Sequence, residues 1–239
     1  MTEFFNVLAP HEARAQLLSH IRPLTEQETL PTAEALGRVT AGALYAPQPL
    51  PAFRRSTMDG YAVRAADTFG ASGSLPAFLG VIGEVPMGQA AEIDLHLGQA
   101  ALVHTGGMIP ETADAVVQVE QTQVVGAEMD APPYEIEIFK SVAQGENVLQ
   151  VGEDVAEKAL ILPAGHILRP QDLGGLLALG ITELAVRRRP RVAILATGDE
   201  VITPDQETGP GQIRDINSYT VAGQVITAGG QPLLGGIIA

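Results

Sequence analysis

Apolar residues near the N-terminus recur at the spacing of a helix. Within residues 10–22 the apolar side chains follow one another at steps of four, one and three positions, at Ala13, Leu17, Leu18 and Ile21. This spacing gathers them on one face, and Pro10 stands in the first turn, where a helix accepts proline. We therefore predict an amphipathic helix over 10–22. A second short helix is predicted after Pro31, extending through Val39.

The middle of the chain alternates short apolar runs with turn residues. Residues 46–53 contain three prolines, which remove backbone donors and favour an extended connector into a second domain. Between Ser56 and about residue 140, alternating apolar patterns predict strands at 101–104, 115–123 and 134–139. The spacing of these strands indicates a small β-rich domain.

The last third of the chain reads as mixed α/β material. Residues 174–180 resemble a helix that ends at a glycine. The apolar run 191–196 is typical of a strand buried in a parallel sheet, a helix is predicted from 217 or 218 to 228, and 232–238 predicts the next strand. Together they form one βαβ unit, the opening of a doubly wound sheet. Because 191–239 is too short to bury both faces of such a sheet, we expect it to be poorly ordered or paired with another chain.

Composition and charge narrow the class of protein. The 239 residues carry a formal net charge of −14 with only 14 Lys and Arg, so a nucleic-acid-binding face or a basic membrane-binding face is not expected. The absence of cysteine excludes disulfides and thiolate metal sites. We expect a cytoplasmic location, since no secretory signal and no apolar run of membrane-spanning length is found.

Two loops in the middle of the chain are candidates for chemistry. In 56–63, Asp59-Gly60 is a turn signal; alternatively, Asp59 and Ser56 project into a cleft beside Arg54 and Arg55, which would suit a phosphate. In 104–110, the Thr105-Gly106-Gly107 stretch could offer backbone N–H groups to an oxyanion, although a plain loop with a structural His104 is the simpler interpretation on local grounds.

Two further loops carry adjacent carboxylates. Glu153 and Asp154 after Gly152 would suit a divalent cation, or they are solvated surface acids. Residues 197–200 directly follow the run 191–196, where the carboxyl ends of parallel strands gather ligands. In 211–218, Asp215 and Asn217 precede a predicted helix, either as N-caps or beside an oxyanion site.

Taken together, these segments resemble a known family. They are FRRSTMDGYA (53–62), TGGMIP (105–110) with DAVV (114–117), GEDV (152–155), PAG (163–165), AILATGDEV (193–201) and GQIRDINS (211–218). In this order they are similar to the molybdopterin molybdenumtransferases, which comprise bacterial MoeA and the E domain of gephyrin. MDGYA and TGDE are the most specific pair, and the motifs spread over nearly the whole chain.

The resemblance implies a fold, a reaction and partners. It implies a mixed N-terminal domain (1–45 with 145–186), an inserted β-rich domain (46–144) and the start of a doubly wound α/β molybdopterin-binding domain (187–239). The implied reaction inserts molybdate into adenylylated molybdopterin, assisted by a divalent cation such as Mg²⁺, and releases AMP. The implied assembly is a homodimer, with molybdopterin adenylyltransferase and maturation proteins of molybdoenzymes as further partners.

Site residues are carried over by motif. The catalytic positions implied are Asp59, Thr105, Asp154 and Glu200. The positions implied to bind the pterin and its phosphates are Ser56, Gly198, Asp199, Asp215 and Asn217. We expect Asp59 and Thr105 to act on the molybdate side and Asp154 with Glu200 to hold the cation and nucleotide, with residues of both subunits meeting in the dimer.

Family motifs rich in Ser and Gly, and a Lys-Pro-Gly-Lys-like segment, would follow Ala239. We therefore expect an N-terminal portion that is inactive alone. The alternative is a non-catalytic dimerising scaffold of the gephyrin type, a role that relies mainly on the family's C-terminal region.

Overall fold

The computed structural model describes residues 7–126 and 132–238, and its contacts divide the chain into two compact units. Unit 1 comprises 1–44 and 160–239, and unit 2 comprises 45–159. Each is described by itself below. In the part of the chain so described, no helix has both the length and the apolar character to cross a membrane.

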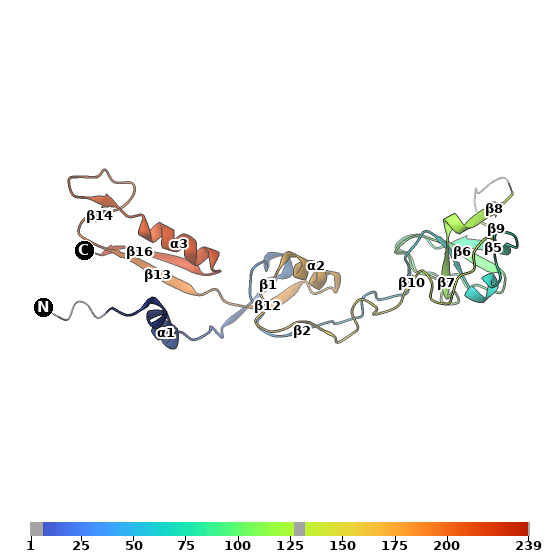
Figure 1. The fold of residues 1–239 in the computed structure, drawn as a ribbon, viewed down its shortest axis with the longest axis horizontal. Helices are drawn as coiled ribbons and strands as arrows, with labels where there is room; N and C mark the ends of the chain where they lie inside the picture. The colour runs from blue at the N-terminus through green and yellow to red at the C-terminus, as the bar shows by residue number, and fades with distance from the viewer. Residues whose placement is uncertain (1–6, 127–131, 239) are drawn as a thin grey trace. The chain divides into compact units, whose positions relative to one another are not determined.

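Unit 1 is a mixed α/β unit built from short helices and two-stranded sheets (Figure 1). Its helices are α1 (Pro10–His20), the 3₁₀ turn η1 (Thr32–Glu34), α2 (Pro170–Ala178) and α3 (Asn217–Thr227). Its strands pair as β1 (Gln27–Pro31) with β12 (Glu183–Arg187), β2 (Leu44–Tyr45) with β11 (Leu160–Leu162), β13 (Arg191–Thr197) with β16 (Gln231–Ile238), and β14 (Val201–Ile202) with β15 (Ile213–Arg214).

The core of unit 1 lies between α2 and the β1–β12 ladder. Its fully or nearly fully buried members are Ala35, Leu162, Leu168, Leu176, Leu184 and Val186. α2 ends at a glycine, as the sequence predicted, because Gly180 adopts a left-handed φ of 76° that closes the helix. The predicted helix through Val39 is wrong: only η1 forms, Leu36 lies in an exposed turn, and Val39 pairs with Ile167 in an isolated bridge.

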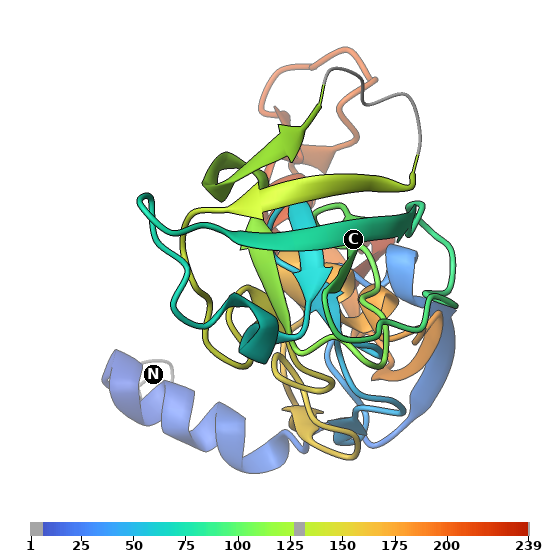
Figure 2. The ribbon, with the colours of Figure 1, turned by 90° about the vertical axis from the view of Figure 1, so that its right-hand side faces the viewer.

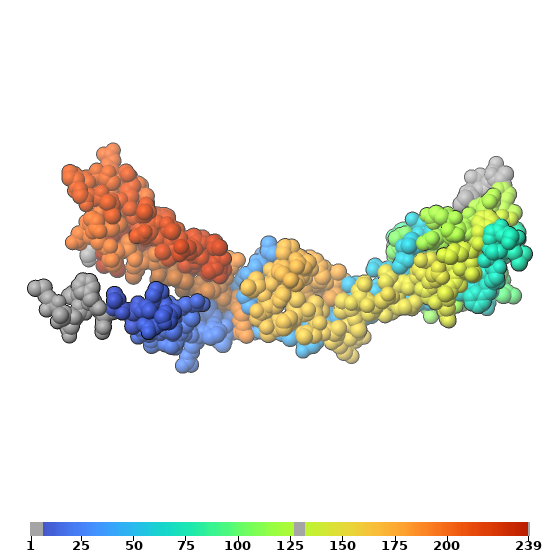
Figure 3. Space-filling model, viewed as in Figure 1, coloured from blue at the N-terminus to red at the C-terminus, as the bar shows by residue number. Residues whose placement is uncertain are grey.

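Two elements of unit 1 are largely exposed, α1 and β13. α1 forms where predicted, but none of its residues is buried, and Leu17 is 62% exposed. β13 and β16 form the predicted parallel pair with α3 packed on it, yet of β13 only Ile194 is buried. Two strands and one helix are too few to cover both faces of a sheet. Residues 191–238 fold as strand, helix and strand, with α3 on the surface in Figure 3, while the pairing of this segment with another chain stays a prediction.

Unit 2 contains one curled six-stranded sheet, which faces the viewer in Figure 2. The strand order is β7 (Ala115–Gln118), β4 (Gly60–Val63), β6 (Gln99–Val103), β5 (Ala77–Glu84), β9 (Tyr134–Ile138) and β8 (Thr122–Val125). Two 3₁₀ turns, η2 (Ala65–Thr68) and η3 (Val119–Gln121), connect them, and β3 (Arg55–Ser56) pairs separately with β10 (Val148–Leu149). The β-rich middle predicted from the sequence is confirmed, except that η3 interrupts the predicted strand 115–123.

Both faces of β4 are buried. Tyr61 and Val63 pack into one apolar cluster and Ala62 into the cluster on the other face. Gly60 opens the strand. A Cβ atom there would lie 2.0 Å from the carbonyl oxygen of Val117, so only glycine fits. Asp59-Gly60 is therefore not a hairpin turn: the glycine permits close approach of β7.

Candidate functional site

Asp59 lies in the turn between β3 and β4 and is fixed by the loop after β6. Its Oδ1 accepts a hydrogen bond from the backbone N–H of Thr105, with N and O 2.9 Å apart. This bond, followed by one from the Thr105 side chain, lowers the pKa of Asp59 below its usual value. The carboxylate is consequently held ionised and oriented, although it remains exposed to solvent.

Ser56 shapes the turn that presents Asp59. Its hydroxyl, on a residue that is only 1% exposed, donates to the carbonyl of Met58 at 2.5 Å and accepts the Met58 N–H at 3.2 Å. In this arrangement the Ser56 side chain satisfies backbone groups of the turn. The structure thus gives Ser56 a local role beside its predicted contact with the pterin substrate.

The loop 104–107 does not offer free backbone donors. The N–H of Thr105 is bound to Asp59, the N–H of Gly106 to the Ser56 carbonyl at 2.8 Å, and the N–H of Gly107 to the His104 carbonyl at 2.9 Å. An oxyanion nest requires unpaired N–H groups that converge on one point. The reading of this loop as a backbone oxyanion site is therefore wrong, and its donors instead fasten β3 and Asp59 to β6.

His104 has a partner that the sequence did not reveal. Its Nε2 lies 2.8 Å from Oε1 of Glu84, the last residue of β5. β5 and β6 run parallel with Glu84 opposite Leu102, so the pair forms where the two strands end together. Twenty positions separate Glu84 and His104, and no motif links them, so only strand pairing identifies the contact.

Asp154 faces an arginine of β3. Its Oδ2 lies 3.7 Å from Nη2 of Arg55, while its backbone N–H is bound to the Leu50 carbonyl at 3.0 Å. The neighbouring Glu153 accepts the N–H of Gln150, so it closes its own loop. Asp154, Arg55, Ser56 and Asp59 thus all lie on or next to β3.

The residues predicted after β13 lie in unit 1. Gly198 has a φ of 141°, and a Cβ atom there would come within 2.8 Å of Oε2 of Glu200. Glycine therefore lets the Glu200 side chain fold back over the turn. The Glu200 carbonyl accepts the N–H of Ile213, which links this turn to β15. Asp199 is exposed at the tip.

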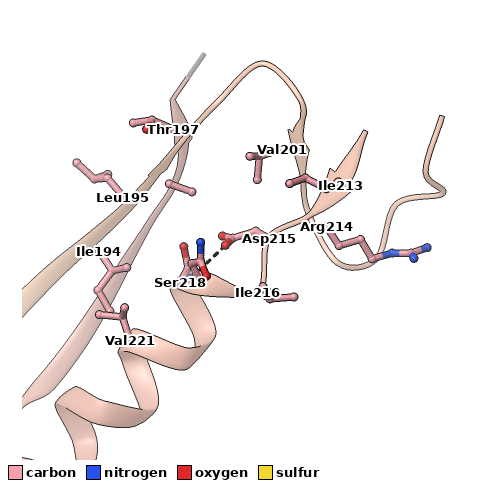
Figure 4. A pocket seen from close by; sticks show the side chains of 12 residues that line it. Ile194, Leu195, Thr197, Val201, Ile213, Arg214, Asp215, Ile216, Ser218 and Val221 are labelled. Atoms are coloured by element: carbon pink, nitrogen blue, oxygen red, sulfur yellow. Dashed lines mark hydrogen bonds between the residues drawn. The ribbon is translucent and has the colours of Figure 1, made fainter. Parts of the chain in front are cut away.

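Asn217 is the first residue of α3 and Asp215 lies two residues before it, beside an open cavity of about 540 Å³ (Figure 4). Asp215 Oδ1 accepts the Ser218 N–H at 3.0 Å, as an N-cap does, and hydrogen bonds from the Ser218 side chain and backbone lower the pKa of Asp215. The cavity is lined by apolar residues of β13, β15 and α3, including Ile194 and Ile213. Its polar lining includes Thr197, Asp215 and Asn217. It lies at the carboxyl end of β13, where ligands of parallel sheets are expected.

The predicted site residues thus form two sets. Asp59, Thr105, Ser56 and Asp154 surround β3 in unit 2, and the remaining five surround the end of β13 and the start of α3 in unit 1. Among the described residues, no three acidic or histidine side chains converge as a metal site. The predicted cation ligands Asp154 and Glu200 belong to different units, and Asp154 already faces a guanidinium group. The assignment of Asp154 and Glu200 to a bound Mg²⁺ ion stays a prediction, since Mg²⁺ needs only one or two carboxylates beside waters and substrate phosphates.

The chain is similar to known proteins over most of its length. Residues 8–180 match the family model of the MoeA N-terminal region (domain I and II). Molybdopterin molybdenumtransferase 2 of Mycobacterium tuberculosis is 38% identical over 215 residues, which cover 90% of this chain and 50% of the relative. The molybdopterin molybdenumtransferase of Bacillus subtilis is 34% identical over 230 residues, which cover 96% and 53%.

A solved structure has the same fold. The molybdopterin biosynthesis moeA protein from Pyrococcus horikoshii superposes with a TM-score of 0.85 at 38% identity, over 95% of this chain and 59% of that one. The chain spans about half the length of the curated relatives that it matches.

Proposed function

Since this chain belongs to the MoeA N-terminal region family, we propose that it acts in molybdenum cofactor biosynthesis, in the insertion of molybdate into adenylylated molybdopterin with release of AMP. In this proposal the reaction uses both sets of site residues, the four around β3 and the five around the end of β13 and the start of α3. The homodimer and a contribution from molybdopterin adenylyltransferase as the donor of substrate belong to the same proposal.

The Asp59–Thr105 contact is the observation that carries the proposal. Insertion replaces oxygen ligands of molybdate with the two dithiolene sulfurs, and each oxygen that leaves must take up protons. A carboxylate fixed by a 2.9 Å hydrogen bond and held ionised can accept a hydrogen bond from such a protonated oxygen without first losing its own proton. No step is assigned to a cation.

The cavity at the start of α3 supports the other half of the reaction. Its apolar wall and the polar groups of Asp215 and Asn217 suit a ring system with hydrogen-bonding edges, such as a pterin. A helix N-terminus beside it favours a negatively charged phosphate. In this role Asp215 orders the first turn of α3, and Asn217 faces the ligand.

The test is molybdate-dependent release of AMP from adenylylated molybdopterin by the 239-residue chain, measured by chromatography. Binding of the substrate is measured in parallel by calorimetry. We expect substrate binding by the chain, and we expect Asp59→Asn to reduce any AMP release at least a hundredfold, since a charged group at the reacting atoms is lost. Asp94→Asn is the matched control, because Asp94 is an exposed carboxylate elsewhere in unit 2. If the wild-type chain neither binds the substrate nor releases AMP, the proposal is refuted.

A further inference from the structure

An oxyanion at the β3 site must be bound by side chains. The N–H groups of residues 105–107 are already hydrogen-bonded to Asp59, Ser56 and His104. Unit 2 is also strongly acidic, so a free anion is repelled unless a cationic side chain is near. The question is which cation of unit 2 is available at this site.

The Lys and Arg residues of unit 2 are Arg54, Arg55, Arg64, Lys140 and Lys158. Arg54 is committed: its guanidinium group donates to the carbonyls of Ala113, Pro110 and Glu111 at 2.9 to 3.1 Å. Lys158 is paired with its neighbour Glu157, and Arg64 lies 4.0 Å from Asp67 beside η2. Lys140 lines a small cavity with Gln121 and Glu146, apart from the β3 strand.

Among these five residues, only Arg55 both lies beside the loop 104–107 and has a guanidinium group whose N–H donors are not committed to hydrogen bonds with other described residues. Its backbone forms a bridge to Met108, and the adjacent Ser56 is bound to Gly106 and Gly107. Its side chain is 35% exposed, and within the described residues its single partner is Asp154 at 3.7 Å, longer than a hydrogen bond. An exposed ion pair at this distance is weak, so a dianion can displace the carboxylate at little cost.

We propose that Arg55 is the anion-binding residue of the β3 site and that Asp154 is its exchangeable internal partner, competing with the incoming oxyanion. The inference rests on the proposed function, which supplies the anion. A guanidinium group binds a tetrahedral oxyanion through two parallel N–H donors and stays charged at every working pH. Both molybdate and the phosphate of the adenylylated substrate have this chemistry.

Equilibrium binding separates these sources. Molybdate alone and AMP alone are titrated into the full 239-residue chain by calorimetry, with wild type, Arg55→Met, Arg55→Lys and Asp154→Asn compared. We expect Arg55→Met to weaken the binding of one of the two anions about tenfold, because a charge-assisted hydrogen bond is lost. Arg55→Lys should recover part of the lost affinity. Asp154→Asn should strengthen binding of the same anion about two- to fivefold, because the competing charge is gone.

Arg64→Met is the control for net charge, since Arg64 is a half-exposed arginine of the same unit, lies 4.0 Å from Asp67, and its loss changes the net charge by the same amount. Equal weakening by Arg64→Met and Arg55→Met would mean a general field effect and would overturn the inference. So would weaker binding in Asp154→Asn, or the absence of saturable binding of either anion to the wild-type chain. AMP release from adenylylated molybdopterin is not part of this comparison, so the proposed function stands or falls separately.

Discussion

Gly60 and Val117 approach so closely that a single added carbon would not fit between them. A Cβ atom on Gly60 would lie 2.0 Å from the Val117 carbonyl oxygen and 2.9 Å from its carbonyl carbon. The contact joins β4 to β7 in a ladder whose first pair is Gly60 with Gln118, and Asp59 is the residue directly before that pair. The stability of the sheet and the geometry of the candidate site therefore depend on the same glycine.

Gly60→Ala is expected to destabilise the chain by about 2–4 kcal/mol, because the clash is with backbone atoms that cannot rotate away. Urea unfolding followed by circular dichroism measures the loss. Gly73→Ala is the control, since nothing lies within 4 Å of a Cβ atom there and its φ is not in the left-handed region. Equal stability of the two variants would show that the β4–β7 contact relaxes without cost.

Arg54→Met is expected to lower the free energy of unfolding by about 2–3 kcal/mol. The guanidinium group holds three backbone carbonyls of the 110–113 segment, and its removal leaves these acceptors without their charged donor. The same urea titration measures it. Lys158→Met, which removes an exposed cation paired with its exposed neighbour Glu157, should change stability by less than about 1 kcal/mol. A smaller loss for Arg54→Met than for Lys158→Met would show that Arg54 does not hold the 110–113 segment in place.

Asp172 makes the stability of unit 1 depend on pH. Hydrogen bonds from the Arg169 side chain, with a further one from His166, hold the pKa of the Asp172 carboxyl far below its usual value despite its burial. A carboxyl whose pKa is depressed by folding contributes stability that is present above its unfolded pKa of about 4 and is lost as pH falls toward the folded value.

Urea midpoints between pH 7 and pH 3 test this linkage. The urea midpoint of the wild-type protein should decrease when the pH falls below about 4. Asp172→Asn should have a lower urea midpoint than wild type at pH 7, and its midpoint should decrease less on acidification. Glu183→Gln, an exposed acid of the same unit, should follow the wild-type curve. Parallel pH curves for Asp172→Asn and wild type would show that Asp172 carries none of the linkage.

Asp215→Ala is expected to cost about 1 kcal/mol through loss of the cap on α3, whereas Asp215→Asn should retain most of it. Hydrogen exchange of the α3 amides, which reports the local opening of that helix, measures the effect. Asp199→Ala is the control, being an exposed acid in the preceding loop. Equal exchange in the Asp215→Ala and wild-type proteins would leave Asp215 without a structural role and would assign it to the ligand.

Local patterns predicted most of the elements. Strands at 101–104 and 134–139, the helix that ends at Gly180 and the parallel strands on either side of α3 all form, because alternation and helix stop signals act within a few residues. The motifs predicted the family that the comparisons show. The three-part division of the chain and the roles of the nine site residues stay predictions. The helix through Val39 failed because the chain turns at Leu36 and Val39 pairs with the distant Ile167.

What the sequence determined by itself is the order of elements, the acidic balance and the identity of the chemical groups available. Only the tertiary structure decided which of those groups are free. The loop 104–107 and Arg54 look like anion binders in sequence, yet their donors are spent on partners that strand pairing brings from distant segments, while Arg55 keeps its own. A hydrogen-bond donor binds a ligand only where the fold leaves it without another acceptor, and the fold sets those partners over separations that no local pattern records.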